Sequence, residues 1–64
     1  MNKLRGLRVA KGLTQEDMAD ILGISKQTYN QKEQGKSEFK TSEINIILDL
    51  FDDENYENIF LDAD

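Results

Sequence analysis

The stretch TQEDMADILGISKQTYNQKEQG, from Thr14 to Gly35, decides the fold of this chain. Apolar residues recur at helical spacing before Gly23, and Ser25 and Gly35 mark the start and end of a second segment, which predicts helices at about 15–22 and 26–34 with a sharp turn between them. The spacing places Met18, Ile21 and Leu22 on one face of the first of these helices. The small side chain of Ala19 allows the two helices to cross closely. The side chains expected to fill the wedge between them are Met18, Leu22, Ile24 and Tyr29.

Capping residues mark where these two helices begin. Thr14 is an N-cap candidate, with Asp17 three residues later as a weaker substitute for the Glu or Gln of a capping box. Ser25 is the N-cap candidate of the next helix. A helix at about 2–11 precedes them, with Leu4, Leu7 and Arg8 on one face, and Gly12 follows where a left-handed residue ends a helix.

The rest of the chain also has helical periodicity. Phe39 lies in a polar connection and is expected to plug the edge of the core. Thr41 is a possible cap for a helix at about 42–51, whose apolar stripe consists of Ile44, Ile47, Leu48 and Phe51. A short last helix follows with Tyr56, Ile59 and Phe60, and residues 61–64 are expected to fray. The prediction is a single all-α domain over residues 1–64, with about five short helices.

Composition excludes several classes of protein. The chain has 64 residues, no cysteine and no histidine, which removes the usual thiolate and imidazole ligands of zinc and the commonest general base. No nucleophile motif or Gly-rich phosphate loop is present, and the carboxylates at 52–54 lack the spacing of a calcium loop. No apolar run approaches the roughly 20 residues that cross a bilayer. We therefore expect no enzyme, metal or cofactor and a cytoplasmic location.

Charge is distributed unevenly along the chain. Residues 1–36 hold seven Lys and Arg against four Asp and Glu, a net charge of +3, whereas residues 37–64 hold one against nine, a net charge of -8. This asymmetry suggests one face turned toward a polyanion and one turned away. The alternative, two solvated faces without a partner, is equally compatible with the charges.

The predicted helix at 26–34 is polar almost all round. Only Tyr29 is clearly core-facing, and the other residues run KQT before it and NQKEQ after it. Such a helix forms when neighbouring helices hold it, and its polar surface then indicates a binding role. The alternative is a solvated surface helix.

Several blocks together resemble one known family. The stretches LRVAKGLTQEDMADILGIS, QTYNQKEQGK, EINIILDLF and ENIF follow one another in the order and at the spacing of the Cro/repressor class of helix-turn-helix domains, also called lambda-repressor-like or XRE-like. The resemblance covers about residues 3–60. It implies a helix-turn-helix unit at about 14–35 and a phage- or prophage-type transcriptional regulator that binds double-stranded operator DNA.

The resemblance also implies a role for individual residues. Gln15 would bond a phosphate and brace the base-reading side chains, which would be Lys26, Gln27 and Gln31 in the major groove. Thr28, Asn30 and Lys36 would lie near the DNA backbone. Arg8 and Glu33 would form a buried ion pair between the first and third helices.

Departures from the family keep a second hypothesis open. Lys32 stands where most members have an apolar residue, and we expect its stem to cover the core while its ammonium reaches the surface. Together with the acidic second half, this favours a protein-binding anti-repressor that engages another repressor through the same fold. A dimer would be weak, would form on DNA, or would be built from the last two helices through Ile59, Phe60 and Leu61.

Overall fold

Five helices account for most of residues 2–61, the part of the chain that the computed structural model describes. They are α1 (Asn2–Ala10), α2 (Gln15–Leu22), α3 (Lys26–Glu33), α4 (Thr41–Leu50) and α5 (Tyr56–Phe60). The described residues contain no strand, so the predicted all-α class with five short helices is confirmed. The fraying expected for residues 62–64 lies outside the described residues.

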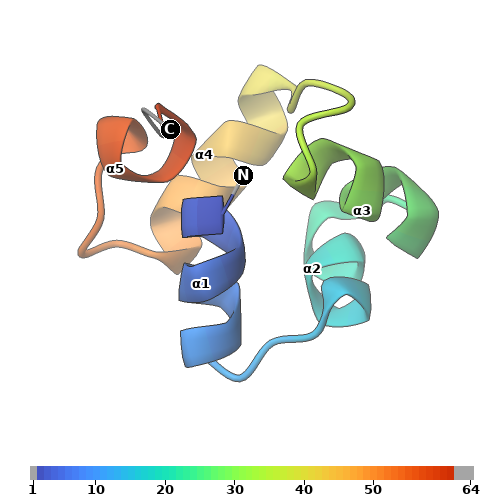
Figure 1. Ribbon diagram of the computed structural model, residues 1–64, viewed down its shortest axis with the longest axis horizontal. Helices are drawn as coiled ribbons and strands as arrows, with labels where there is room; N and C mark the ends of the chain where they lie inside the picture. Colours follow the sequence, from blue (N-terminus) through green and yellow to red (C-terminus); the bar gives the residue numbers. More distant parts are fainter. Residues whose placement is uncertain (1, 62–64) are drawn as a thin grey trace.

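The helices surround one small apolar core. In Figure 1, α4 lies behind α1, with α2 and α3 to one side and α5 to the other, and α1 contacts both α3 and α5. Every helix contributes at least one buried side chain. The buried apolar side chains are Leu4, Met18, Ala19, Leu22, Tyr29, Ile47, Phe51 and Ile59. Phe39 packs at the edge of this core, with its ring 6.1 Å from that of Tyr29 and 5.7 Å from that of Phe60.

Ile21 is not part of the buried face of α2, contrary to the expectation from spacing. Its side chain is 42% exposed, whereas Met18, Ala19 and Leu22 are buried. Successive residues of a helix are about 100° apart, and Ala19 extends the buried face in the direction away from Ile21. The close crossing of α3 at Ala19 therefore sets which side of α2 faces the core.

The turn between α2 and α3 depends on Gly23. Its φ is +71°, in the left-handed region, and the amide of Ile24 donates to the carbonyl of Ala19 at 3.0 Å. The amide of Gly23 donates to the carbonyl of Asp20 at 3.2 Å, which completes a Schellman-type ending. Because this ending satisfies carbonyls of the last turn of α2, the chain reverses within a few residues and α3 begins at once.

The N-terminal caps of α2 and α3 are those that the sequence predicts. Thr14 Oγ1 accepts from the amide of Asp17 at 3.0 Å, and Asp17 Oδ2 accepts from the amide of Thr14 at 2.9 Å, a reciprocal capping box. Ser25 Oγ accepts from the amide of Thr28 at 3.1 Å and donates to Thr28 Oγ1 at 2.8 Å.

The start of α4 differs from the prediction. Thr41 is the first residue of the helix and Lys40 is the N-cap, so Thr41 is not the cap. The amide of Lys40 donates to Glu43 Oε1 at 2.8 Å, and this bond from the third helical residue fixes the beginning of the helix. The same bond holds the side chain of Glu43 on the buried side of α4.

The last helix presents a smaller surface than expected. Ile59 is 0% exposed and belongs to the core, so the prediction that it lies on a dimer surface is wrong. Ile59 is part of the buried apolar core, and the helix that carries it contacts α1. Leu61, which is 59% exposed, and the half-buried Phe60 remain accessible.

Candidate nucleic-acid interface

The outward surface of α3 consists of polar side chains. Gln27 and Gln31 are exposed and lie four residues apart, so they emerge from one face of the helix. Lys26 is exposed at the first position of the helix, and Lys36 is exposed just beyond its end. Thr28 and Asn30 are half-buried. The surface therefore offers amide and ammonium groups to a partner while the opposite side of α3 faces the domain.

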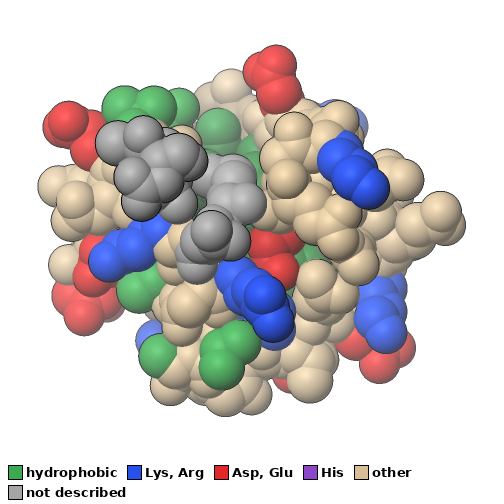
Figure 2. All heavy atoms as spheres, in the orientation of Figure 1, with side chains coloured by type: hydrophobic (Ala, Val, Ile, Leu, Met, Phe, Trp, Pro, Cys, Tyr) green, Lys and Arg blue, Asp and Glu red, His purple; other side chains and the backbone are tan. Residues whose placement is uncertain are grey.

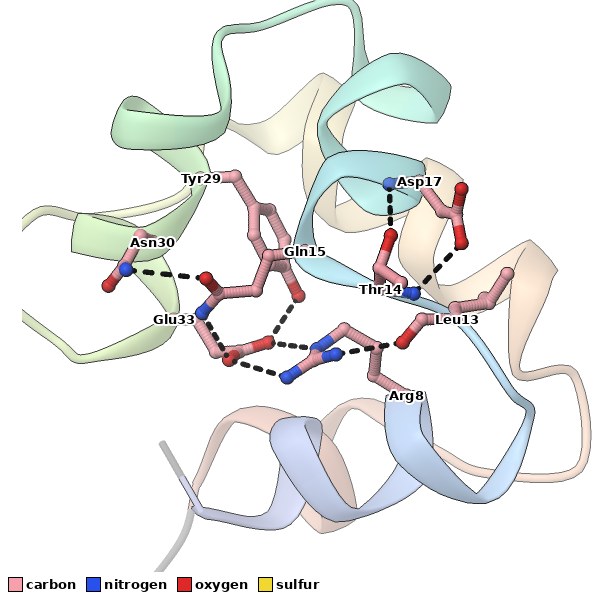
Figure 3. A network of polar contacts seen from close by, with 8 residues as sticks. All are labelled: Arg8, Leu13, Thr14, Gln15, Asp17, Tyr29, Asn30 and Glu33. Carbon is pink, nitrogen blue, oxygen red and sulfur yellow. Dashed lines mark hydrogen bonds and ion pairs between the residues drawn. The ribbon is translucent and has the colours of Figure 1, made fainter.

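Glu33 is the centre of a buried polar network beneath this surface (Figure 3). Arg8 of α1 approaches it side-on, with Nε at 2.8 Å from Oε2 and Nη2 at 3.3 Å from Oε1. The hydroxyl of Tyr29 donates to Oε2 at 2.7 Å, and Gln15 Nε2 donates to Oε1 at 3.1 Å. One carboxylate thus joins side chains from the first three helices.

The arginine of this network is also held from its other side. Arg8 Nη1 donates to the backbone carbonyl of Leu13 at 2.8 Å, so the guanidinium spans from α3 to the segment that enters α2. All buried side-chain nitrogen and oxygen atoms among the described residues have a hydrogen-bond partner. This is the condition under which a buried ion pair is tolerated in a protein interior.

The network shifts the pKa of its members in opposite directions. Burial alone would raise the pKa of Glu33, but hydrogen bonds from Arg8, Tyr29 and Gln15 outweigh it and hold that pKa below its usual value. The hydrogen bond to Glu33 raises the pKa of Arg8. Burial, followed by the bond to the Glu33 carboxylate, raises the pKa of Tyr29. At neutral pH the network therefore holds a carboxylate, a guanidinium and a neutral phenol.

Gln15 connects this network to the outward surface. Its side chain is half-buried, and Asn30 Nδ2 donates to Gln15 Oε1 at 3.3 Å while Gln15 Nε2 reaches Glu33. The brace that Gln15 makes is therefore with Asn30, on the inner side of α3. The structure brings Arg8, Gln15, Asn30 and Glu33 into one network. It leaves Gln27 and Gln31 on the exposed side of the same helix.

An open cleft of about 710 Å³ lies beside this network. It is bounded by Arg5 and Arg8 of α1, by the beginning of α2 at Gln15, and by Lys26 of α3. In the space-filling view of Figure 2, the surface is hollowed near the centre and Lys and Arg side chains occur on both sides of the hollow. Arg5 was not singled out from the sequence, although it precedes Arg8 by three residues and such residues share a helix face.

Lys32 forms a second ion pair on the other side of α3. Its Nζ lies 2.6 Å from Glu43 Oε1, and the two residues are 6% and 4% exposed. The expectation that its ammonium reaches the surface is wrong, because Glu43 of α4 supplies a carboxylate inside the domain. Hydrogen bonds from Lys32 and from the amide of Lys40 outweigh the opposing effect of burial and lower the pKa of Glu43.

The sequence contained a signal for this second pair. Glu43 precedes Ile47 by four residues, so it lies on the same helix face as a fully buried side chain. A charged residue in that register requires a partner of opposite charge. Lys32, which the sequence places where an apolar residue is usual, is that partner.

Neither a metal-ligand cluster nor a membrane-spanning helix occurs among residues 2–61. No group of three or more Cys, His, Asp or Glu side chains in this part of the chain has the arrangement of a metal site. None of the described helices combines the length and the apolar character needed to cross a membrane.

Comparison with known protein families identifies the family of this chain. A family model described as Helix-turn-helix matches residues 4–54. The matched segment contains the Glu33 network, the Lys32–Glu43 pair and the outward surface of α3, and it ends before α5. No curated protein and no solved structure matches the chain.

Proposed function

The chain belongs to the XRE/lambda-repressor-like helix-turn-helix family of DNA-binding regulatory domains, and from this premise we propose that it is a sequence-specific transcriptional regulator of the Cro or short-repressor type. In this proposal α3 enters the major groove of duplex DNA. The observation that carries it is the two-sided character of α3, whose inner side is fixed by two buried ion pairs while its outer side is polar and unobstructed.

Gln27 and Gln31 are the proposed base-reading residues. Both are exposed on one face of α3, and a glutamine amide is able to pair with the N6 and N7 edge of adenine. Lys26, the first residue of α3, is the third proposed base-reading residue. Thr28, Asn30 and Lys36 flank that face of α3, and Gln15 is held beside it by Asn30. These four residues would contact the phosphate backbone and so fix how α3 is oriented in the groove.

The charge asymmetry supports this orientation. Four exposed carboxylates, those of Asp49, Asp52, Asp53 and Glu57, belong to α4, the following turn and α5, whereas the exposed carboxylates nearer α3 are those of Glu16, Asp17, Asp20 and Glu38. A field of this kind favours approach to a polyanion with α3 leading. The net charge of -5 then opposes docking through the remaining faces.

Dimer formation is part of the proposal. A partly palindromic operator would place one α3 in each half-site, about one helical turn apart. Tyr56, Leu61 and the half-buried Phe60 are the accessible apolar or aromatic residues near the end of the described chain, and together they would give only a small contact. Such a contact suits a dimer that forms on DNA.

Binding to duplexes at several salt concentrations tests the function. The probes are a duplex recovered by the protein from a random-sequence pool and a random duplex of equal length. We expect a steep loss of affinity as salt rises, and a preference for the recovered duplex that falls by at least about tenfold in Gln27→Ala or Gln31→Ala. Asn45→Ala, which removes an exposed amide from α4, is the control and should keep the preference.

The same measurement distinguishes the second candidate function. The acidic second half favours a protein-binding anti-repressor on this fold, and such a protein would show no preference for any duplex at low salt. That result would overturn the DNA proposal, and a protein partner would then be sought among other repressors of the same host.

A further inference from the structure

The cleft between α1 and α3 contains three basic side chains, and one of them is already neutralised. Arg8 uses Nε and Nη2 on Glu33 and Nη1 on the carbonyl of Leu13, so its charge and these donors are engaged inside the domain. Arg5 of α1 and Lys26 of α3 are both exposed, and both line the cleft. Two cations from different helices are therefore available to one ligand.

The remaining lining of the cleft favours a singly charged anion. Glu33 is committed to Arg8, Tyr29 and Gln15, so Glu16 is the carboxylate of the lining that still opposes an anion. Arg5 and Lys26 against Glu16 leave one positive charge in excess. A guanidinium and an ammonium together bind the oxygens of a phosphodiester, each through its own donors.

The place of the cleft decides which phosphodiester it would hold. Lys26 lines the cleft and is also the first residue of α3, directly before the proposed base-reading Gln27. If Gln27 reaches a base edge, a backbone phosphate at the edge of the groove lies on the side of Lys26. A free phosphate has the same oxygen chemistry, so the test must separate the two sources.

We infer that Arg5 and Lys26 clamp one phosphate of the DNA backbone, and that Lys26 therefore positions the domain and does not read a base. The inference rests on the proposed function and changes it in two respects. It adds Arg5 to the interface, and it leaves the base reading by α3 to Gln27 and Gln31.

Salt titrations of single variants test the clamp. In Arg5→Ala and in Lys26→Ala, affinity for the recovered duplex and for random duplex should fall by the same factor, so that the preference between them is unchanged. The slope of log affinity against log salt is negative. In the double variant Arg5→Ala/Lys26→Ala it should become shallower by about 1, the value for one phosphate contact. Arg5→Lys should recover part of the affinity.

The control variant removes one positive charge just beyond the end of α1. Lys11 is exposed and lies outside the cleft, with its Nζ 5.7 Å from the centre of the Phe51 ring. Lys11→Ala should therefore change affinity and slope less than Arg5→Ala does. Equal effects of the two variants would show that Arg5 acts only through its positive charge and makes no specific phosphate contact. That result would overturn the clamp.

Three further outcomes would also overturn the inference. A change in duplex preference on Lys26→Ala would return Lys26 to base reading, and wild-type affinity and slope in Arg5→Ala would remove Arg5 from the interface. NMR shifts at both residues that saturate with inorganic phosphate and stay unchanged with duplex would assign the cleft to a free anion. A wild-type protein that binds no duplex would instead defeat the proposed function itself.

Discussion

Lys32 Nζ lies 2.6 Å from Glu43 Oε1 with both side chains buried, so an ion pair joins the end of α3 to the beginning of α4 inside the core. The Arg8–Glu33 pair, 2.8 Å between Nε and Oε2, holds the opposite side of α3 to α1. A helix with few apolar residues is thus fixed by charges on both sides of Tyr29.

Removing one partner of the Lys32–Glu43 pair should destabilise the domain, whereas replacing both partners by apolar residues should leave its stability nearly unchanged. Lys32→Met leaves the Glu43 carboxylate buried without its cation, and we expect it to lower the free energy of unfolding by about 3–5 kcal/mol. Lys32→Met combined with Glu43→Leu should restore stability to near the wild-type value, because an apolar pair needs no desolvation of charge. Urea unfolding followed by circular dichroism measures both, and a double variant as unstable as the single would contradict this account.

Arg8 and Arg5 should behave differently although they lie on the same helix. Arg8→Ala removes the cation from buried Glu33, and its melting temperature should fall clearly or the domain should fail to fold. Arg5→Ala removes an exposed side chain and should change stability by less than about 0.5 kcal/mol. Thermal melts compare the two. An unchanged melt in Arg8→Ala would show that the buried pair contributes nothing to stability.

Acid should destabilise the domain through its buried carboxylates. The pKa values of Glu33 and Glu43 are lower in the folded state than the usual value, so each contributes stability that is complete above the unfolded pKa of about 4.3. That stability is lost as the pH falls through the folded pKa. We expect constant stability from about pH 8 to 6 and a decline below about pH 4.5.

A matched variant isolates the carboxylates in that experiment. The combined Lys32→Met and Glu43→Leu protein lacks one of the two titrating groups, so its stability should decline less steeply with acid than that of the wild type. Urea midpoints at several pH values give the comparison. Equal slopes in the two proteins would show that Glu43 does not contribute to the acid sensitivity.

Glycine-to-alanine changes should have opposite signs at two positions. Gly23 has a φ of +71°, and a Cβ added there would meet no atom within 4 Å, so the penalty of Gly23→Ala is that of the left-handed backbone alone, about 1–2 kcal/mol. Gly6 lies within α1 and also has open space around a Cβ. Gly6→Ala should stabilise the protein by about 0.5–1 kcal/mol. Destabilisation of equal size at both positions would refute the backbone explanation.

Local signals predicted most of the fold. The caps at Thr14 and Ser25 and the turn at Gly23 depend on hydrogen bonds between residues at most five positions apart, and such bonds follow from residue type and spacing. The apolar stripe of α4 at Ile47 and Phe51 follows from helical periodicity. These features do not require knowledge of how the helices pack.

Features that depend on the angle between helices could not be predicted in the same way. Whether Lys32 reaches solvent or a carboxylate depends on where α4 places Glu43, and the exposure of Ile21 depends on which side of α2 the other helices cover. Arg5 joins the candidate interface only because α1 and α3 both line one cleft. Each of these features depends on the relative position of two helices, so it could not be predicted from the sequence of either helix alone.

The Glu33 carboxylate accepts hydrogen bonds from α1, α2 and its own helix, and this arrangement has a consequence for folding cooperativity. A buried carboxylate is favourable only when its partners are all in place, since each missing donor leaves desolvated charge. States in which α3 is formed but α1 or α2 is displaced are therefore raised in free energy. Under the proposed function, Gln27 and Gln31 would therefore be presented to DNA by the complete domain, and a partly folded chain would lack the surface that selects a sequence.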